Sequence, residues 1–165
     1  MDIVRVGLLI IHIIAAALWL SEEAIGIIFK RLIQANQGKP AELTLAQAAM
    51  TLFGTFGPLA SMGILLTGIG MTLHSGWALL GIGAFTPGWL VLKQIIYLGL
   101  SAYVMVVLLP QSKRIAKSFG DSTASGILSD DGRAHLHQFW MIGRVHTLIV
   151  LVNVLLAVCK PSIGG

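Results

Sequence analysis

The chain has 165 residues, of which 56% are hydrophobic, and it carries a formal net charge of +4 with a mean hydropathy of +0.86. Only 11% of the residues are charged, where a soluble domain carries about 25%, so a soluble protein of this length could not cover its apolar surface in one core. The composition therefore predicts a single integral membrane domain, 1–165, with the lipid bilayer as its solvent. The basic residues stand beside hydrophobic runs, which indicates topology signals rather than a nucleic-acid-binding patch.

Four hydrophobic segments follow one another along the chain, at about 3–29, 46–74, 89–109 and 139–159. Each reaches the roughly 20 residues that a helix needs to cross the hydrocarbon layer. Only helices and closed barrels satisfy every backbone polar group in lipid, and strand-like alternation is absent from the sequence. The predicted fold class is therefore all-α, a membrane four-helix bundle.

The connections between these segments differ in character. Residues 76–88 are rich in glycine and uncharged, which predicts a connector at the membrane surface with Trp77 and Trp89 as interfacial anchors. Pro110 is expected to end the third helix, because proline removes a backbone donor and clashes with the preceding turn. Residues 111–132 are then expected to form the one extended polar loop.

The lysines and arginines predict the orientation of the bundle. The basic residues of the first and third connections are Lys30, Arg31, Lys39, Lys113, Arg114, Lys117 and Arg133. The opposite side carries Arg5 and Lys160. Because cytoplasmic loops carry the excess of Lys and Arg, both termini are predicted to lie on the non-cytoplasmic side of a cell inner (cytoplasmic) membrane, which the chain crosses several times.

Several ionisable side chains interrupt the apolar segments: His12, Glu22, Glu23, Lys93, Arg144 and His146. Such a group is costly in lipid and is a functional hypothesis by default. At about 1.5 Å per residue, His12 lies roughly 10 Å and Lys93 roughly 6 Å below the outer surface. Lys93 has the alternative of snorkelling to the headgroups. One of the two glutamates is expected to pair with Arg144 or His146 across helices one and four.

For His12, a function is favoured over a packing role. Its neighbours along the helix are isoleucines, so its imidazole needs a ligand, a metal or a hydrogen bond from another helix. His12 and Trp19 are seven residues apart and share one face of the first helix, which is expected to face the bundle interior. The glycines of the second segment allow close helix packing or leave space for a flat cofactor.

His12 followed by Trp19 resembles the start of the HemJ family of membrane protoporphyrinogen oxidases. The segment Gly88-Trp89-Leu90-Val91-Leu92-Lys93 resembles the Gly-Trp-Leu-x-x-Lys at the start of that family's third helix. The same outline recurs in CopD-like copper-resistance proteins. The chain departs from the HemJ pattern at Glu22 and Glu23, where the family has small residues, and at Val104, near which the family has a histidine.

The resemblance implies a b-type haem near His12 and a role for Lys93. We therefore expect His12 to be an axial ligand of the iron, Trp19 to lie beside the cofactor and Lys93 to bind the haem propionates. The second ligand is expected to be His74, which lies near the same surface. His146 is the alternative second ligand, although its position along the fourth segment places it deeper.

Three classes of function stay open at this point. The first is a haem-binding membrane redox protein, either an oxidase or an electron-transfer subunit, with a porphyrin or a quinone as partner. The second is a CopD-like copper transporter, against which the methionines form no run. The third is a cofactor-free structural subunit of a larger membrane complex or a homo-oligomer. No catalytic residue is assigned, and the sequence leaves open whether the protein is an enzyme or an accessory subunit.

Overall fold

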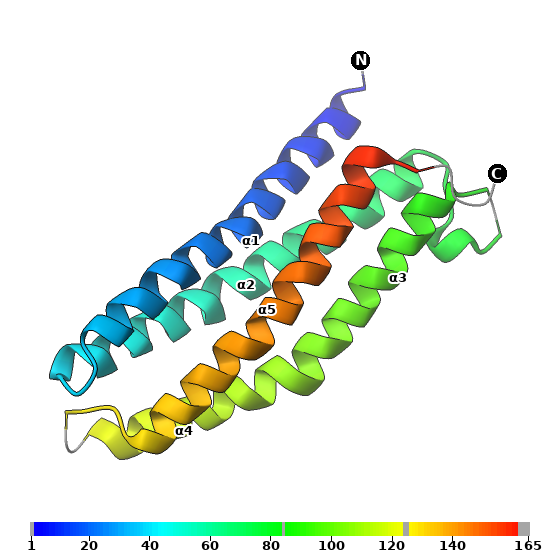
Figure 1. The fold of residues 1–165 in the computed structure, drawn as a ribbon. Coiled ribbons are helices and arrows are strands. Elements are labelled where there is room, and N and C mark those ends of the chain that lie inside the picture. Colours follow the sequence, from blue (N-terminus) through cyan, green and yellow to red (C-terminus); the bar gives the residue numbers. More distant parts are fainter. Residues whose placement is uncertain (1, 84, 124–125, 162–165) are drawn as a thin grey trace.

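A computed structural model describes residues 2–83, 85–123 and 126–161. All regular secondary structure in these ranges is helical, and both ends of the chain lie at the same end of an elongated bundle, the terminal end (Figure 1). The long helices are α1 (Ile3–Ala35), α2 (Pro40–His74), α3 (Gly88–Tyr103) continued by α4 (Leu109–Thr123), and α5 (Asp130–Cys159). Within the described residues, four helical segments are long and apolar enough to cross a membrane, the third being Gly88–Ser122. The predicted all-α membrane bundle is therefore confirmed.

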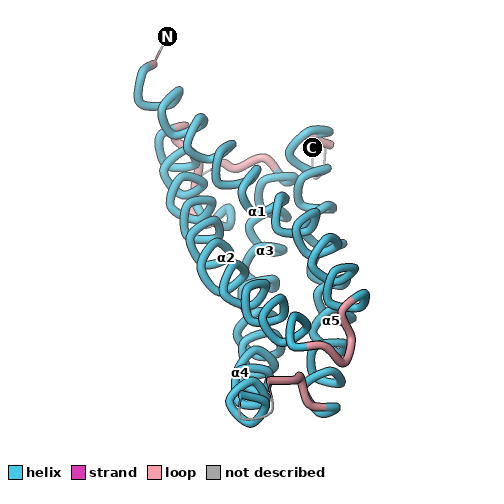
Figure 2. Tube along the Cα trace, turned by 90° about the vertical axis from the view of Figure 1, so that its left-hand side faces the viewer, coloured by secondary structure: helices cyan, strands magenta, loops and turns pink. Residues whose placement is uncertain are grey.

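The helices are longer than the hydrophobic segments that predicted them. α1 has 33 residues and α2 has 35, which is about 50 Å at 1.5 Å per residue, whereas the hydrocarbon layer is about 30 Å thick. Each helix therefore continues for several turns beyond the lipid. The extra turns lie at the end opposite the termini, where Figure 2 shows α4, and we call this the α4 end. Hydropathy marks only the part of a helix that lies in lipid, so the predicted bounds were too short.

The prediction that Pro110 ends the third helix is wrong. The helix passes from α3 through a π-helical segment, η2 (Val104–Leu108), into α4 without interruption. In η2 the backbone hydrogen bonds join residues that are five apart, as in the bond from the Leu109 N–H to the Val104 carbonyl. Pro110 thus follows a turn that is already widened, and its ring meets less obstruction there than in a regular helix. Residues 111–123 are consequently helix, and only 126–129 of the predicted loop are described without one.

The helix backbones approach one another closely within two hairpins, α1 with α2, and α3–α4 with α5. A Cβ placed on Gly63 of α2 would lie 2.9 Å from the Cβ of Ala15 on α1, so no larger residue fits there. A Cβ on Gly70 would lie 3.2 Å from the Leu8 side chain. Small residues allow this close contact, which matters in lipid because the hydrophobic effect does not drive helices together there.

At the α4 end the bundle has a hydrophobic core of the kind found in soluble proteins. Its buried members come from all the long helices of this end and from the turn before α5: Ile33, Leu43, Ala46, Ala49, Ile115, Phe119, Leu128 and Leu136. In contrast, large apolar residues of α1 nearer the terminal end, such as Ile10, Ile13 and Ile14, are more than half exposed in the isolated chain. Those residues face lipid, while the α4 end excludes water from a conventional core.

A buried ion pair joins the two hairpins beside this core. The Nε and Nη2 atoms of Arg133 each donate to a different carboxylate oxygen of Glu42 at 2.8 Å, and Nη1 donates to Asp130 at 2.7 Å. The Glu42 side chain is 2% exposed and also accepts a hydrogen bond from the Gly38 N–H at 2.7 Å. Paired, bidentate geometry of this kind is what makes a buried charge tolerable. The sequence predicts only a topology role for Arg133, because its partner Glu42 is distant along the chain.

At the terminal end, Asp2 joins the start of α1 to the end of α2. Its carboxylate caps α1 by accepting from the Val4 and Arg5 N–H groups, and it also bonds the imidazole of His74. The hydrogen bond from His74 is the main cause that lowers the pKa of the Asp2 carboxyl below its ordinary value. His74 is therefore engaged at the membrane surface.

The orientation of the bundle gives a first prediction. Reporter fusions placed at the C-terminus and in the connection between α4 and α5 should report the non-cytoplasmic and the cytoplasmic side, respectively, because Lys113, Arg114 and Lys117 lie exposed at the α4 end. Paired fusions of alkaline phosphatase and a fluorescent protein provide the measurement. A connection that scores as non-cytoplasmic would reverse the assignment.

Replacement of Arg133 by methionine should destabilise the protein by about 3 kcal/mol, because it leaves the Glu42 carboxylate buried without its partner. The free energy of unfolding in mixed detergent micelles measures this loss. The double variant Glu42→Gln with Arg133→Met removes both charges and should recover most of the stability. Equal losses for the single and double variants would show that the charge pair is not what holds this end together.

Candidate functional site

A cavity of about 280 Å³ lies between the two hairpins, in the half of the bundle nearest the terminal end. Its walls come from α1, α2, α3 and α5 and from the short 3₁₀ turn η1 (Leu79–Gly81) that connects α2 to α3. Most lining side chains are aliphatic. The ones that carry a polar group are His12, Trp19, Thr72, Lys93, Gln94, Tyr97 and Asn153. The lining contains two basic side chains and no acidic one, so the cavity favours a ligand that is apolar in its body and negatively charged at an edge.

His12 forms a hydrogen bond from α1 to α2. Its Nδ1 lies 2.8 Å from the hydroxyl oxygen of Thr67, and the Thr67 hydroxyl itself donates to the Gly63 carbonyl at 2.5 Å. A hydroxyl has one proton to donate, so Thr67 must accept from His12, and the imidazole proton must sit on Nδ1. His12 Nε2 then carries a lone pair.

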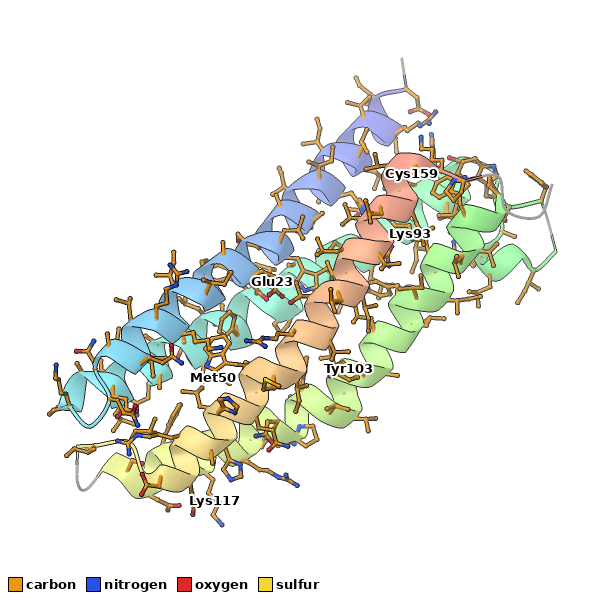
Figure 3. The ribbon with its side chains drawn as sticks, viewed as in Figure 1. Glu23, Met50, Lys93, Tyr103, Lys117 and Cys159 are labelled. Atoms are coloured by element: carbon orange, nitrogen blue, oxygen red, sulfur yellow. The ribbon has the colours of Figure 1, made fainter. Side chains whose placement is uncertain are left out.

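Lys93 and Asn153 face each other across α3 and α5. The Asn153 amide donates a long hydrogen bond to the Lys93 carbonyl at 3.4 Å. The Asn153 side-chain oxygen is buried without a partner, and the Lys93 ammonium has no ion pair among the described residues. Figure 3 shows Lys93 in the terminal half of the bundle, with Glu23 nearer the middle. The cavity wall thus offers a cation and a hydrogen-bond acceptor that the protein itself leaves unused.

Trp19 and Tyr97 close the cavity on the side toward the α4 end. Their rings meet edge to face with centroids 6.3 Å apart. The Tyr97 hydroxyl donates to the Ser61 carbonyl at 2.9 Å and lies 2.9 Å from the Ser61 hydroxyl. Since its own proton is used on the carbonyl, Tyr97 accepts from the Ser61 hydroxyl. These contacts connect α1, α2 and α3 and fix the floor of the cavity.

Three of the residues predicted for the site, His12, Trp19 and Lys93, line this one cavity. His74 does not line it and is bonded to Asp2 instead. His146 lies behind Trp19, with ring centroids 5.5 Å apart, and it does not line the cavity either. The cavity therefore offers a single imidazole. Ranking the histidines by depth left out the direction in which each side chain leaves its helix.

Of the contacts predicted between the first and fourth apolar helices, α1 and α5, the structure brings Glu23 and His146 close together. The Nδ1 atom of His146 lies 3.9 Å from a carboxylate oxygen of Glu23. Arg144, the other predicted partner, is exposed and makes no ion pair with a described residue. Its long side chain can reach the headgroups by snorkelling.

Sequence reasoning missed the contributions of Asn153, Gln94 and Tyr97. Asn153 carried a usable signal, because it is an amide in the middle of the apolar segment 139–159, where any polar group has to be explained. Gln94 accepts a hydrogen bond from the Leu80 N–H at 2.6 Å and so supports the turn η1 over the cavity. That role depends on a contact between distant residues and has no signature in the sequence.

The sequence matches the model of a known protein family. The sequence model of a family described as predicted integral membrane protein (DUF2269) matches residues 7–161. The chain is a member of the DUF2269 family. The match includes every residue of the cavity lining. No curated protein and no solved structure shows significant similarity to this DUF2269 member.

The hydrogen bond between His12 and Thr67 can be tested with a matched pair of variants. Thr67 and Thr72 are both buried on α2 and both donate to the carbonyl four residues earlier, but only Thr67 accepts from an imidazole. Thr67→Val should cost about 1 kcal/mol more than Thr72→Val in the free energy of unfolding, because it leaves the His12 Nδ1–H buried without an acceptor. Equal costs would show that this hydrogen bond contributes nothing.

Proposed function

We propose that this DUF2269 member binds one b-type haem in the cavity, with His12 as an axial ligand, and serves as a membrane redox protein. The observation that carries the proposal is the state of His12. Its Nδ1–H is held by Thr67, which leaves Nε2 as a neutral imidazole donor beside an apolar cavity. Metal-binding histidines in proteins are usually oriented by a hydrogen bond at the other ring nitrogen, and neutral imidazole is a good ligand for haem iron.

The other residues of the cavity fit the remaining parts of a haem. Aliphatic side chains from all the surrounding helices suit the porphyrin faces, and Gly68 lies beside the His12 ring, where an added Cβ would be 3.7 Å away. The Lys93 ammonium would pair with a propionate, a role for which the protein supplies no competing acid in the lining. When bound, a haem supplies one-electron chemistry; the protein's residues hold and orient it and exclude water.

The size of the cavity sets a condition on this function. Its volume of about 280 Å³ lies at the lower end of small-molecule sites, which run from about 300 to 1,000 Å³. Haem binding therefore requires the two hairpins to move apart in this half of the bundle. The fold allows it, because side-chain contacts rather than close backbone packing connect the hairpins there.

Only one imidazole is available at the cavity, so the proposal differs from a two-histidine site. Neither His74 nor His146 lines the walls, so His12 would be the histidine that holds the haem from this cavity, and the haem would supply one-electron chemistry there. Whether the redox partner is a porphyrin or a quinone is decided by assay.

The alternative functions are weighed against the same geometry. Among the described residues, no three His, Cys, Asp or Glu side chains gather in a way that could hold a metal ion, which gives CopD-like copper binding little support. One observation favours a cofactor-free structural subunit. The hydrogen bond to Thr67 already gives one of the two ring nitrogens of His12 a partner without any ligand.

A reduced-minus-oxidised spectrum and a pyridine haemochrome assay of the detergent-purified protein test the proposal. The wild type should carry haem, and His12→Ala should abolish the haem spectrum while the protein still inserts into the membrane. His74→Ala and His146→Ala serve as matched controls and should keep the spectrum, since neither side chain lines the cavity. Lys93→Met should weaken haem retention without removing the axial ligand.

Two results would count against haem. Full haem occupancy in the His12→Ala variant would show that the ligand is another residue. A wild-type protein without haem, purified from a membrane with sufficient haem, would favour the structural subunit.

A further inference from the structure

A second group of ionisable side chains lies outside the His12 cavity. It consists of Glu22 and Glu23, which are adjacent on α1, and His146 of α5, which packs beside Trp19 and lies 3.9 Å from Glu23. The His146 side chain is only 12% exposed, and that of Glu23 is 40% exposed. None of the three lines the His12 cavity, so this group is separate from the proposed haem site.

Glu22 is the unusual member of this group. It lines a smaller cavity of about 190 Å³ between α1 and α2, whose other lining residues are Leu18, Ser21, Ile25, Leu52, Phe53 and Phe56. One carboxyl oxygen of Glu22 is fully buried and has no hydrogen-bond partner. The two carboxyl oxygens lie 3.4 Å from the position that a Cβ on Gly57 would occupy, so the carboxyl group lies against the α2 backbone.

Among the residues that the structure describes, no cation is placed to neutralise Glu22. On α1 its charged neighbour is Glu23, which has the same sign; α2 contributes only uncharged residues to the cavity; and on α5 the imidazole of His146 lies beside Glu23. Arg144 of α5 is exposed and makes no ion pair with a described residue. A carboxylate that is buried without a partner is very costly in apolar surroundings, whereas the neutral acid is not.

The depth of the group allows protons to reach it. About 20 residues cross the hydrocarbon layer, and counted from Arg5 they end near Ile25. Glu23 then lies about 3 Å inside the boundary on the α4 side. The 3.9 Å separation between Glu23 and His146 is too long for a direct hydrogen bond and leaves the pair able to exchange protons through water.

From these contacts we propose that Glu22, Glu23 and His146 form a proton-binding site, in which Glu22 carries the proton in its apolar cavity and the Glu23–His146 pair exchanges it with the water at the α4 end. The ligand is a proton, and its binding involves no electron transfer. The site does not depend on haem in the neighbouring cavity.

Labelling with dicyclohexylcarbodiimide in native membranes tests the Glu22 part. The reagent adds to a protonated carboxyl group in apolar surroundings and rearranges to a stable N-acylurea, with no leaving group. Mass spectrometry should find the adduct on Glu22, with a yield that falls as the pH rises, and the adduct should be lost in Glu22→Gln. Glu42 is an internal control, because two hydrogen bonds from Arg133 keep it ionised and covered.

Stability gives a second, independent measurement for Glu22. Glutamine resembles a protonated glutamate, so Glu22→Gln should leave the thermal unfolding temperature unchanged, whereas Glu42→Gln should lower it. An unlabelled Glu22, labelling that does not depend on pH, or a large loss of stability in Glu22→Gln would each overturn the proton-binding assignment.

Trp19 reports on the Glu23–His146 pair. Its indole lies 5.5 Å from the His146 ring, and a protonated imidazole quenches indole fluorescence more strongly than a neutral one. In the wild type, the fluorescence should fall as the pH is lowered and recover when the pH is raised again. The difference between this titration and that of His146→Gln gives the contribution of the His146 imidazole. A titration that is identical in the two proteins would show that His146 does not exchange protons in this range.

Discussion

The solvent changes along the axis of this bundle, from lipid around the terminal half to water around the α4 end, and the two halves are held together by different forces as a result. In lipid, apolar burial gives no net drive for association, so helices meet where small residues let the backbones approach. The contact of Gly63 with Ala15 is of this kind. In water, the hydrophobic effect applies, and the residues around Leu43 and Ile115 form a conventional core.

This division explains why the cavity lies where it does. The two hairpins are fastened at the α4 end by the hydrophobic core and by the Glu42–Arg133 ion pair. In the lipid half no comparable force draws them together, and they meet only through layers of side chains such as Trp19 and Tyr97. Space remains between them beyond that layer, and it is lined by the polar groups that the hairpins do not use on each other.

Trp19 contacts two chemically different groups of side chains. It lines the apolar cavity together with His12 and Lys93, and its ring also packs beside His146, which has Glu23 as its neighbour. The Lys93 ammonium and the Glu23 carboxylate are therefore not paired with each other among the described residues.

The sequence by itself determined the helical bundle and its four apolar helices, because lipid leaves a helix as the natural backbone solution. Helical periodicity placed His12 and Trp19 on one face, whereas Lys93 was placed near them by its depth below the outer surface and by the family resemblance. The sequence did not determine the lengths of the helices, since hydropathy changes at the edge of the lipid and a helix need not end there. The continuation past Pro110 depends on the π turn of η2, and the role of Arg133 depends on Glu42, which is distant in the sequence. Only the tertiary structure decided which histidine lines the cavity, because depth along a helix follows from residue number, whereas the direction of a side chain relative to its neighbours follows from how the hairpins pack.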